Sequence, residues 1–236
     1  MFTSIYDVQK KLRSSGNKKT ASQLQKFFKT GKGEYGEDDI FLGIRVPKLR
    51  KYIKECNNIS IAEISTLLTS AYHEERMFSL LMLVDRFSNG NVKEKKTIYE
   101  TYIKHTGWIN SWDLVDCSAE HIAGAYLKNR DKQPLYKLAS STLLWDRRIA
   151  IISTFHFIKH NEYKDSLKIS EILKHDSEDL IHKAVGWMLR EIGKRDLTAE
   201  ENFLKKHYKN MPRTMLRYAI EKFDEEKRQA YLKGKI

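Results

Sequence analysis

The sequence predicts an all-α fold in which helical repeats stack as an α-solenoid. No run of alternating apolar and polar residues ends in an Asn-Gly or Asp-Gly hairpin signal, and the Asn-Gly at 89–90 lies between helical patterns. Apolar helices that open with a base begin at Arg76, Arg148, Lys183 and Arg213. Their starts lie roughly 30–35 residues apart, or about twice that, which is the spacing of stacked helix pairs. An irregular helical bundle is the alternative, because the repeats have diverged strongly.

The composition is that of a folded, strongly basic chain. Its 236 residues carry 43 Lys+Arg against 31 Asp+Glu, a formal net charge of +12, and 41% of them are hydrophobic. We expect a single domain over residues 1–236, in which the N-terminal helices, about 1–35, are the least defined by pattern. The positive charge makes nucleic acid the leading partner class and an anionic membrane surface the second.

Neither a membrane span nor a signal peptide is predicted. The longest apolar run covers only 80–84, and the N-terminal stretch contains Asp7 and lacks an apolar core before a cleavage site. Cys56 and Cys117 form neither a CxxC pair nor a disulfide framework. We therefore expect a cytoplasmic protein.

Helix starts are marked along the chain by prolines and capping boxes. The prolines that a first helical turn tolerates are Pro47, Pro134 and Pro212. Capping boxes are predicted at 60–63, 91–94 and 198–201. The glycine-rich stretch 31–36 lacks the GK[ST] ending of a phosphate-binding loop, so it is predicted to connect two helices.

The helix predicted over 181–194 has an unusual polar face. Its apolar face consists of Ile181, Ala184, Val185, Met188, Leu189 and Ile192. Lys183, Trp187, Arg190 and Lys194 fall together on the opposite face. This stripe predicts a contact surface in which cations bind phosphates and the indole meets a sugar or base. The alternative is a buried tryptophan with a cation–π contact from Arg190.

A second helix, predicted over 111–127, carries carboxylates that a polyanion-binding chain does not need for affinity. Trp112 and Asp116 lie one turn apart on one face, and Glu120 follows one turn further. Ala119 and Ala123 leave space beside the acid. Taken alone, Asp116 fits a helix cap or an ion pair with a neighbouring arginine better than it fits a functional role.

Four segments, in order, resemble one family. The segments are 41–50 (FLGIRVPKLR), 111–116 (SWDLVD), 144–151 (LWDRRIAI) and 181–194 (IHKAVGWMLREIGK). They are similar to the AlkD family of bacterial alkylpurine DNA glycosylases, which are built from HEAT-like repeats. The resemblance implies a solenoid whose concave, basic face grips duplex DNA.

The resemblance also implies roles for individual residues. Trp112, Asp116 and Trp187 match the residues that line the lesion site, and Arg148 matches an arginine that supports DNA contact. Arg45 stands where the family has a glutamine. We expect this replacement to change the DNA contact at that position and not the chemistry. The full set of DNA contacts that we predict is Arg148, Lys183, Arg190, Lys194, Arg45 and Arg213.

The implied reaction explains the carboxylate. Alkylation at N3 or N7 makes a purine cationic, and breaking its N-glycosidic bond builds positive charge on the deoxyribose. Asp116 would offset that charge and orient the attacking water, while Trp112 and Trp187 would pack against the sugar. The family acts without enclosing the base, so cationic lesions should be favoured over neutral ones and bulk on the base tolerated. Nothing marks a Schiff-base lysine, so we expect hydrolysis without strand cleavage.

The expected partner is duplex DNA containing alkylated purines, bound by a monomer associated with the bacterial nucleoid. No cofactor or metal is expected, because the eight histidines include no HExxH motif or convincing ligand set. Two other functions remain open. One is a catalytically silent solenoid that binds damaged or branched DNA, and the other is a protein-binding scaffold, for which basic residues would be scattered rather than striped.

Overall fold

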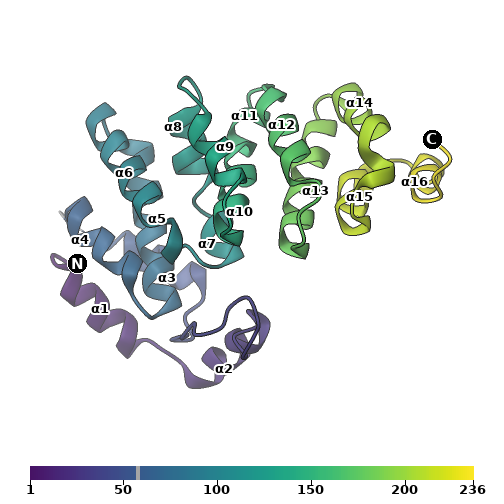
Figure 1. Ribbon diagram of the computed structural model, residues 1–236. Helices are drawn as coiled ribbons and strands as arrows, with labels where there is room; N and C mark the ends of the chain where they lie inside the picture. The colour runs from purple at the N-terminus through teal and green to yellow at the C-terminus, as the bar shows by residue number, and fades with distance from the viewer. Residues whose placement is uncertain (57–58) are drawn as a thin grey trace. The chain divides into compact units, whose positions relative to one another are not determined.

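The computed structural model describes residues 1–56 and 59–236, which fold as two compact units, Met1–Ser118 and Ala119–Ile236. Within these ranges the chain forms no β-strand, only isolated bridges from Phe2 to Cys56 and from Ile40 to Tyr72. The predicted all-α class is confirmed, and the succession of helices along each unit (Figure 1) agrees with a solenoid of helical repeats. The single domain over 1–236 stays a prediction.

The helices of the first unit are α1 (Ile5–Ser14), α2 (Lys18–Phe27), α3 (Val46–Ile53), α4 (Ile61–Thr66), α5 (His73–Asn89), α6 (Val92–Lys104) and α7 (Trp112–Asp116), with 3₁₀ turns η1 (Leu67–Thr69) and η2 (Thr106–Trp108). The second unit begins with a π-helical turn. Its elements are η3 (Glu120–Gly124), α8 (Ala125–Leu127), α9 (Gln133–Ala139), α10 (Leu144–Ser153), α11 (Phe155–Ile158), α12 (Lys164–Leu173), α13 (Asp179–Gly193), α14 (Leu197–His207), η4 (Tyr208–Asn210), α15 (Arg213–Ala219), η5 (Ile220–Lys222) and α16 (Glu225–Leu232).

Helix α5 is the centre of the first unit. It packs against α3, α4, α6 and α7, and every residue from His73 to Leu83 is buried. The neighbouring helices α3, α4 and α6 contribute the fully buried side chains Leu49, Ile64 and Ile98 to the same core. Its first turn is different, because four polar residues in a row, 73–76, are each no more than 3% exposed. Charge buried to this extent requires partners, and these partners organise the site described below.

Helix α13 is the centre of the second unit. It packs against α10, α12, α14 and α15, and Figure 1 shows α10, α12 and α13 side by side. The apolar face predicted for this helix is confirmed as buried. A Cβ at Gly186 would lie 2.4 Å from the carbonyl oxygen of Met215 and 2.5 Å from Cβ of Tyr218. Glycine at this position therefore lets α15 approach α13 closely.

Two of the three predicted capping boxes are confirmed, at Ser60–Glu63 and Asn91–Glu94. The third, at 198–201, is wrong. Helix α14 is capped two residues earlier by Asp196, whose carboxylate accepts a hydrogen bond from the backbone N–H of Ala199 at 2.9 Å. An extended residue directly before the helix suits a cap, whereas Thr198 already lies inside it.

The glycine-rich stretch 31–36 connects α2 and α3, as predicted. Among the described helices, none is long and apolar enough to cross a bilayer.

Candidate functional site

Trp112 and Asp116 are the first and last residues of α7, and both are half-buried. Their spacing places them one turn apart on one face of the helix. The indole stacks on Phe28, with ring centroids 5.3 Å apart and planes inclined by 18°, and it meets Phe27 edge-on at 6.0 Å. Helix α7 therefore presents an indole, backed by two phenyl rings, one turn from a carboxylate.

The prediction of one continuous helix over 111–127 is wrong. Helix α7 ends at Asp116, three turn residues follow, and η3 is π-helical. The hydroxyl of Ser118 donates to the carbonyl oxygen of Leu114 at 2.5 Å, a local bond that competes with regular helix. Glu120 does not extend the Trp112–Asp116 face as a further helical turn. It is buried and forms an ion pair with Lys159 at 2.5 Å.

A neighbouring face of α7, about 100° round the helix from Trp112 and Asp116, contacts α5 through Asp113 and the C-cap residue Cys117, which lie one turn apart. Nε2 of His73 lies 2.9 Å from Oδ2 of Asp113, and the thiol of Cys117 lies 3.6 Å from the sulfur of Met77. Burial raises the pKa of the Cys117 thiol, and the negative charges of Asp113 and Asp116 raise it further. The thiol is therefore a protonated packing group, not a nucleophile.

A buried ion network surrounds the start of α5. Nδ1 of His73 lies 2.8 Å from Oδ2 of Asp39, and Arg76 bonds the other oxygen of the same carboxylate. Burial alone would lower the pKa of His73, but its hydrogen bonds to Asp113 and Asp39, with their charges, raise it to about 9. Burial alone would raise the pKa of Asp39, but His73 and Arg76 together lower it. The imidazole is therefore an imidazolium near neutral pH.

The carboxylate of Glu74 fixes the segment that leads to Arg45. It accepts the backbone N–H groups of Leu42, Gly43 and Ile44 at 2.7, 2.7 and 3.0 Å. Gly43 has φ +84°, and a Cβ there would lie 2.2 Å from the carbonyl oxygen of Asn17, so only glycine fits this turn. The buried carboxylate thereby places the exposed Arg45 directly before α3.

A cavity of about 340 Å³ lies beside α7 in the first unit. Its apolar walls include Leu24, Phe27, Phe28, Phe41, Pro47 and Met77. Its polar lining includes Arg45, His73 and Asp113. Asp113 and His73 already bond each other, so the cavity adds aromatic surface and the exposed cation Arg45 to the neighbourhood of α7.

In the second unit, Arg148 and Trp187 are connected through α13. Arg148, in α10, is only 5% exposed, and its Nη1 donates to the carbonyl oxygen of Leu180 in α13 at 2.6 Å. Trp187 is half-buried, with its ring centroid 5.7 Å from that of Phe155. The guanidinium thus helps to hold the helix that carries the indole, and its direct contact with DNA stays a prediction.

The cations predicted to line α13 each have a carboxylate partner. Nζ of Lys183 lies 2.7 Å from Asp179, and Nζ of Lys194 lies 2.5 Å from Glu191. Arg190 bonds Glu221 in η5 rather than standing free. Arg213 is exposed at the start of α15. The Lys183–Asp179 pair is exposed on both sides, and an ion pair of this kind is worth at most about 1 kcal/mol, so a phosphate can replace its carboxylate. Arg190 and Glu191 are more buried, with side chains 16% and 9% exposed.

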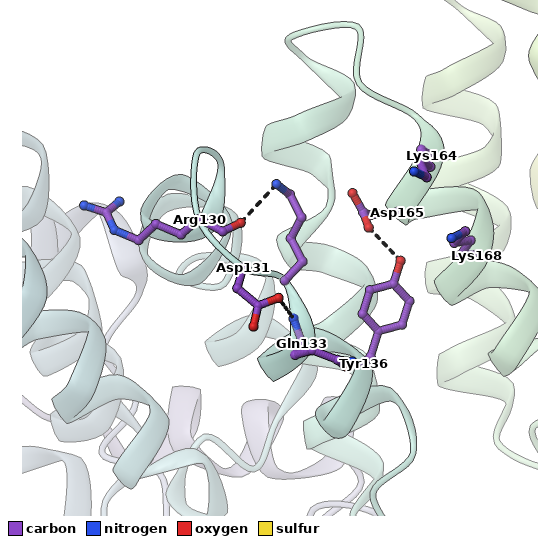
Figure 2. Close-up of a pocket in the computed structure, with 8 residues that line it drawn as sticks. Arg130, Asp131, Gln133, Tyr136, Lys164, Asp165 and Lys168 are labelled. Atoms are coloured by element: carbon purple, nitrogen blue, oxygen red, sulfur yellow. Dashed lines mark hydrogen bonds between the residues drawn. The ribbon is translucent and has the colours of Figure 1, made fainter.

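A separate shallow pocket of about 600 Å³ lies on α9 and α12 (Figure 2). The hydroxyl of Tyr136 donates to Asp165 at 2.6 Å, and Nζ of Lys132 donates to the backbone carbonyl of Arg130 at 3.2 Å. Lys164 and Lys168 complete its lining on α12. Because these lysines lie on α12 and not on α13, replacing one of them is a control for replacing a cation of the α13 stripe.

The described residues contain no group of three or more His, Cys, Asp or Glu side chains placed to hold a metal ion. Sequence reasoning overlooked Asp39, His73 and Asp113, which form the connected centre of the first unit. A signal was present, since His-Glu-Glu-Arg at 73–76 directly precedes the long apolar part of α5. Four consecutive polar residues at the start of a core helix indicate a buried network when the helix is central.

Fold and site together define an all-α, helical-repeat protein with an indole and a carboxylate paired on a short helix. The family model described as "DNA alkylation repair enzyme" matches residues 8–223, so the chain belongs to that family. A solved structure described as a predicted DNA alkylation repair enzyme from Enterococcus faecalis is similar, with a TM-score of 0.67 and 17% sequence identity. The match covers 89% of this chain and 97% of that one, and it supports the fold. No curated protein matches the chain.

Proposed function

We propose that this protein is an AlkD-like DNA glycosylase that hydrolyses the N-glycosidic bond of cationic N3- or N7-alkylated purines in duplex DNA. The observation that carries the proposal is the pairing on α7. Trp112, stacked on Phe28, lies one helical turn from Asp116 in a chain that belongs to the DNA alkylation repair enzyme family. A carboxylate at the DNA-contacting surface of a chain of net charge +12 weakens DNA binding. The proposal therefore gives Asp116 a role in the reaction and not in affinity.

The chemistry needs a fixed negative charge beside a sugar that becomes positive. Asp116 is the group that offsets this charge and orients the attacking water. Trp112 and Trp187 offer electron-rich faces to the developing cation. The reaction uses no pocket around the base, so the intrinsic lability of a cationic lesion supplies selectivity and bulky alkyl groups are accepted.

Binding in this proposal comes from the basic face of the solenoid. Lys183, Arg190 and Lys194 exchange their carboxylate partners for DNA phosphates, with Arg45 and Arg213 as further contacts. Arg148 supports this surface through its bond to Leu180. The protein acts as a monomer on duplex DNA, associated with the nucleoid of a bacterial cytoplasm.

The test is release of methylated purine from N-methylated duplex DNA by the wild type and by Asp116→Asn. The wild type is expected to release 7-methylguanine and 3-methyladenine without added metal and without cutting the strand. Asp116→Asn should slow release by about 10²–10³-fold, because one preorganised electrostatic contact is lost, while DNA binding is kept. A duplex with a neutral adduct, 1,N6-ethenoadenine, should be a poor substrate.

The matched control is Asp85→Asn, an exposed aspartate on α5 in the same unit, which should leave release unchanged. Equal release by wild type and Asp116→Asn would remove Asp116 from the mechanism. Tight binding of alkylated duplex with no release by the wild type would instead favour the silent DNA-binding solenoid, and no DNA binding would favour the protein scaffold.

A further inference from the structure

Helix α7 carries the proposed reacting pair but has little to hold it in place by itself. It is five residues long, and its N-cap residue, Ser111, makes no side-chain capping bond. An isolated helix of this length is unstable in water. The orientation of Trp112 and Asp116 must therefore be set by contacts from outside α7.

The strongest such contact passes through His73. Its two ring nitrogens bond two carboxylates, Asp39 in the loop before α3 and Asp113 in α7, at 2.8 and 2.9 Å. Carboxylates accept hydrogen bonds, so both nitrogens must carry hydrogen, and the ring bridges the two acids as a cation. The side chain of His73 is 3% exposed, that of Asp39 5% and that of Asp113 16%. Water therefore screens these bonds little.

A cluster of aromatic rings links the same histidine to Trp112. Phe41 stacks on the imidazole with centroids 4.4 Å apart, and Phe28 contacts both the imidazole, at 5.2 Å, and Phe41, at 5.1 Å. Trp112 stacks on Phe28 at 5.3 Å. The ring cluster and the ion pair reach adjacent residues of α7, Trp112 and Asp113. Together they restrict both the position of α7 and its rotation about its own axis.

We propose that His73, held by Asp39, is the positioning residue for the Trp112–Asp116 face of α7. This inference rests on the proposed function, but its structural part can be tested without DNA. His73 itself is buried and acts through Asp113, so it is not a catalytic residue. Asp39 acts one step further away, because it fixes the ring of His73.

Asp39 and Asp113 face the two ring nitrogens of His73, and Arg76 faces Asp39. Two further acids follow His73 on α5. Glu74 is bound by three backbone N–H groups, and Glu75 is paired with Arg13 of α1. The pKa of His73 is raised from 6.5 to about 9. Its contribution to stability is therefore complete below pH 6.5 and is lost as pH rises through about 9. Positioning of α7 should weaken over the same range.

The experiment uses the full chain labelled with 5-fluorotryptophan, whose Trp112 ¹⁹F resonance is assigned with Trp112→Phe. In His73→Gln this resonance should shift or broaden, while the resonances of Trp145 and Trp187 stay in place. The matched control is Arg147→Gln. It breaks the ion pair between Arg147 and Asp176, which are 14% and 5% exposed, in the second unit, and it should leave the Trp112 resonance unchanged.

The wild type supplies a test that needs no substitution. Its Trp112 resonance should titrate with a midpoint near pH 9. The midpoint should fall in Asp113→Asn, which removes one of the two carboxylates that raise the pKa of His73 and which also serves if His73→Gln does not fold. A Trp112 resonance unchanged from pH 7 to 10 in the wild type, or unchanged in a folded His73→Gln, would overturn the proposal.

Activity separates the positioning role from the proposed function. On methylated duplex DNA, His73→Gln should lower the single-turnover rate at least about tenfold with DNA affinity within twofold of wild type. The wild-type rate should fall above about pH 9, and the variant should lack that decline. If the resonance responds as expected but the wild type releases no base, the proposed function is wrong and the positioning of α7 stands.

Discussion

The ion network at the start of α5 and the Lys183–Asp179 pair of α13 differ in burial, and the difference separates two tasks. In the first unit, His73, Asp39 and Arg76 are 3%, 5% and 3% exposed, and His73 and Arg76 both bond the carboxylate of Asp39. In the second, Lys183 and Asp179 are 40% and 57% exposed. A buried pair fixes geometry, because losing one partner leaves the other uncompensated, whereas an exposed pair exchanges partners easily. The first arrangement suits placement of a reacting group, and the second suits reversible phosphate binding.

The largest difference is expected for removal of an acid from each region. Asp39→Ala leaves His73 and Arg76 buried without their shared carboxylate and should lower the free energy of unfolding by about 3–5 kcal/mol. Asp179→Ala removes an exposed partner of Lys183 and should cost at most about 1 kcal/mol. Guanidinium denaturation of both variants and the wild type measures this. Similar small losses would mean that burial does not distinguish the two networks.

A buried acid without such a partner sharpens the comparison. Glu200, in α14, is 1% exposed, and its Oε1 has no hydrogen-bond partner among the described residues. Burial raises the pKa of this carboxyl to about 8, with a further contribution from Glu201 that Arg190 partly offsets. Asp39, which is also buried but has two cationic partners, has a lowered pKa.

The consequence is a pH dependence that belongs to the second unit. A raised carboxyl pKa means that the folded state binds the proton more tightly than the unfolded state. Stability should therefore fall as pH rises from about 4.5 to 8, by at most about 1.4 kcal/mol per pH unit. In thermal denaturation, Glu200→Gln should remove the part of this loss that lies below pH 6.5, where His73 contributes no change. His73→Gln should keep that part and reduce only the loss between pH 6.5 and 9, and if it removes the loss below pH 6.5, the loss belongs to the first unit.

The sequence predicted much of the local structure within single helices, although it placed the cap of α14 at Thr198 instead of Asp196. The apolar face of α13 and the boxes at Ser60 and Asn91 depend on residues within one or two turns, and all were confirmed. The helix over 111–127 was predicted wrongly because the chain changes after Asp116 to a turn and then to the π-helical η3, which packs against α10. Helical periodicity does not report such a change.

In the candidate site, too, the features set by residues close in sequence were predicted and those set by distant residues were not. Trp112 and Asp116 were found because they lie four residues apart, and the pair is one turn apart on α7. The support from His73 was overlooked because its partners, Asp39 and Asp113, are 34 and 40 residues away. No local pattern joins them, and only the packing of α5 brings them together. Ion pairing of Arg190 with Glu221 was hidden for the same reason.

The smallest expected effect tests the exchange of partners along α13. Replacing Lys183 by Gln should reduce the slope of log K for duplex DNA against log salt by roughly one, and Lys194→Gln should do the same. Each loss should weaken binding only modestly at physiological salt, because the ion pair to Asp179 or Glu191 is lost along with the phosphate contact. The control is Lys168→Gln on α12, which removes an equal charge from the separate pocket of Figure 2. If Lys168→Gln lowers the slope as much as Lys183→Gln, affinity comes from net charge alone and the α13 stripe has no special role in DNA binding.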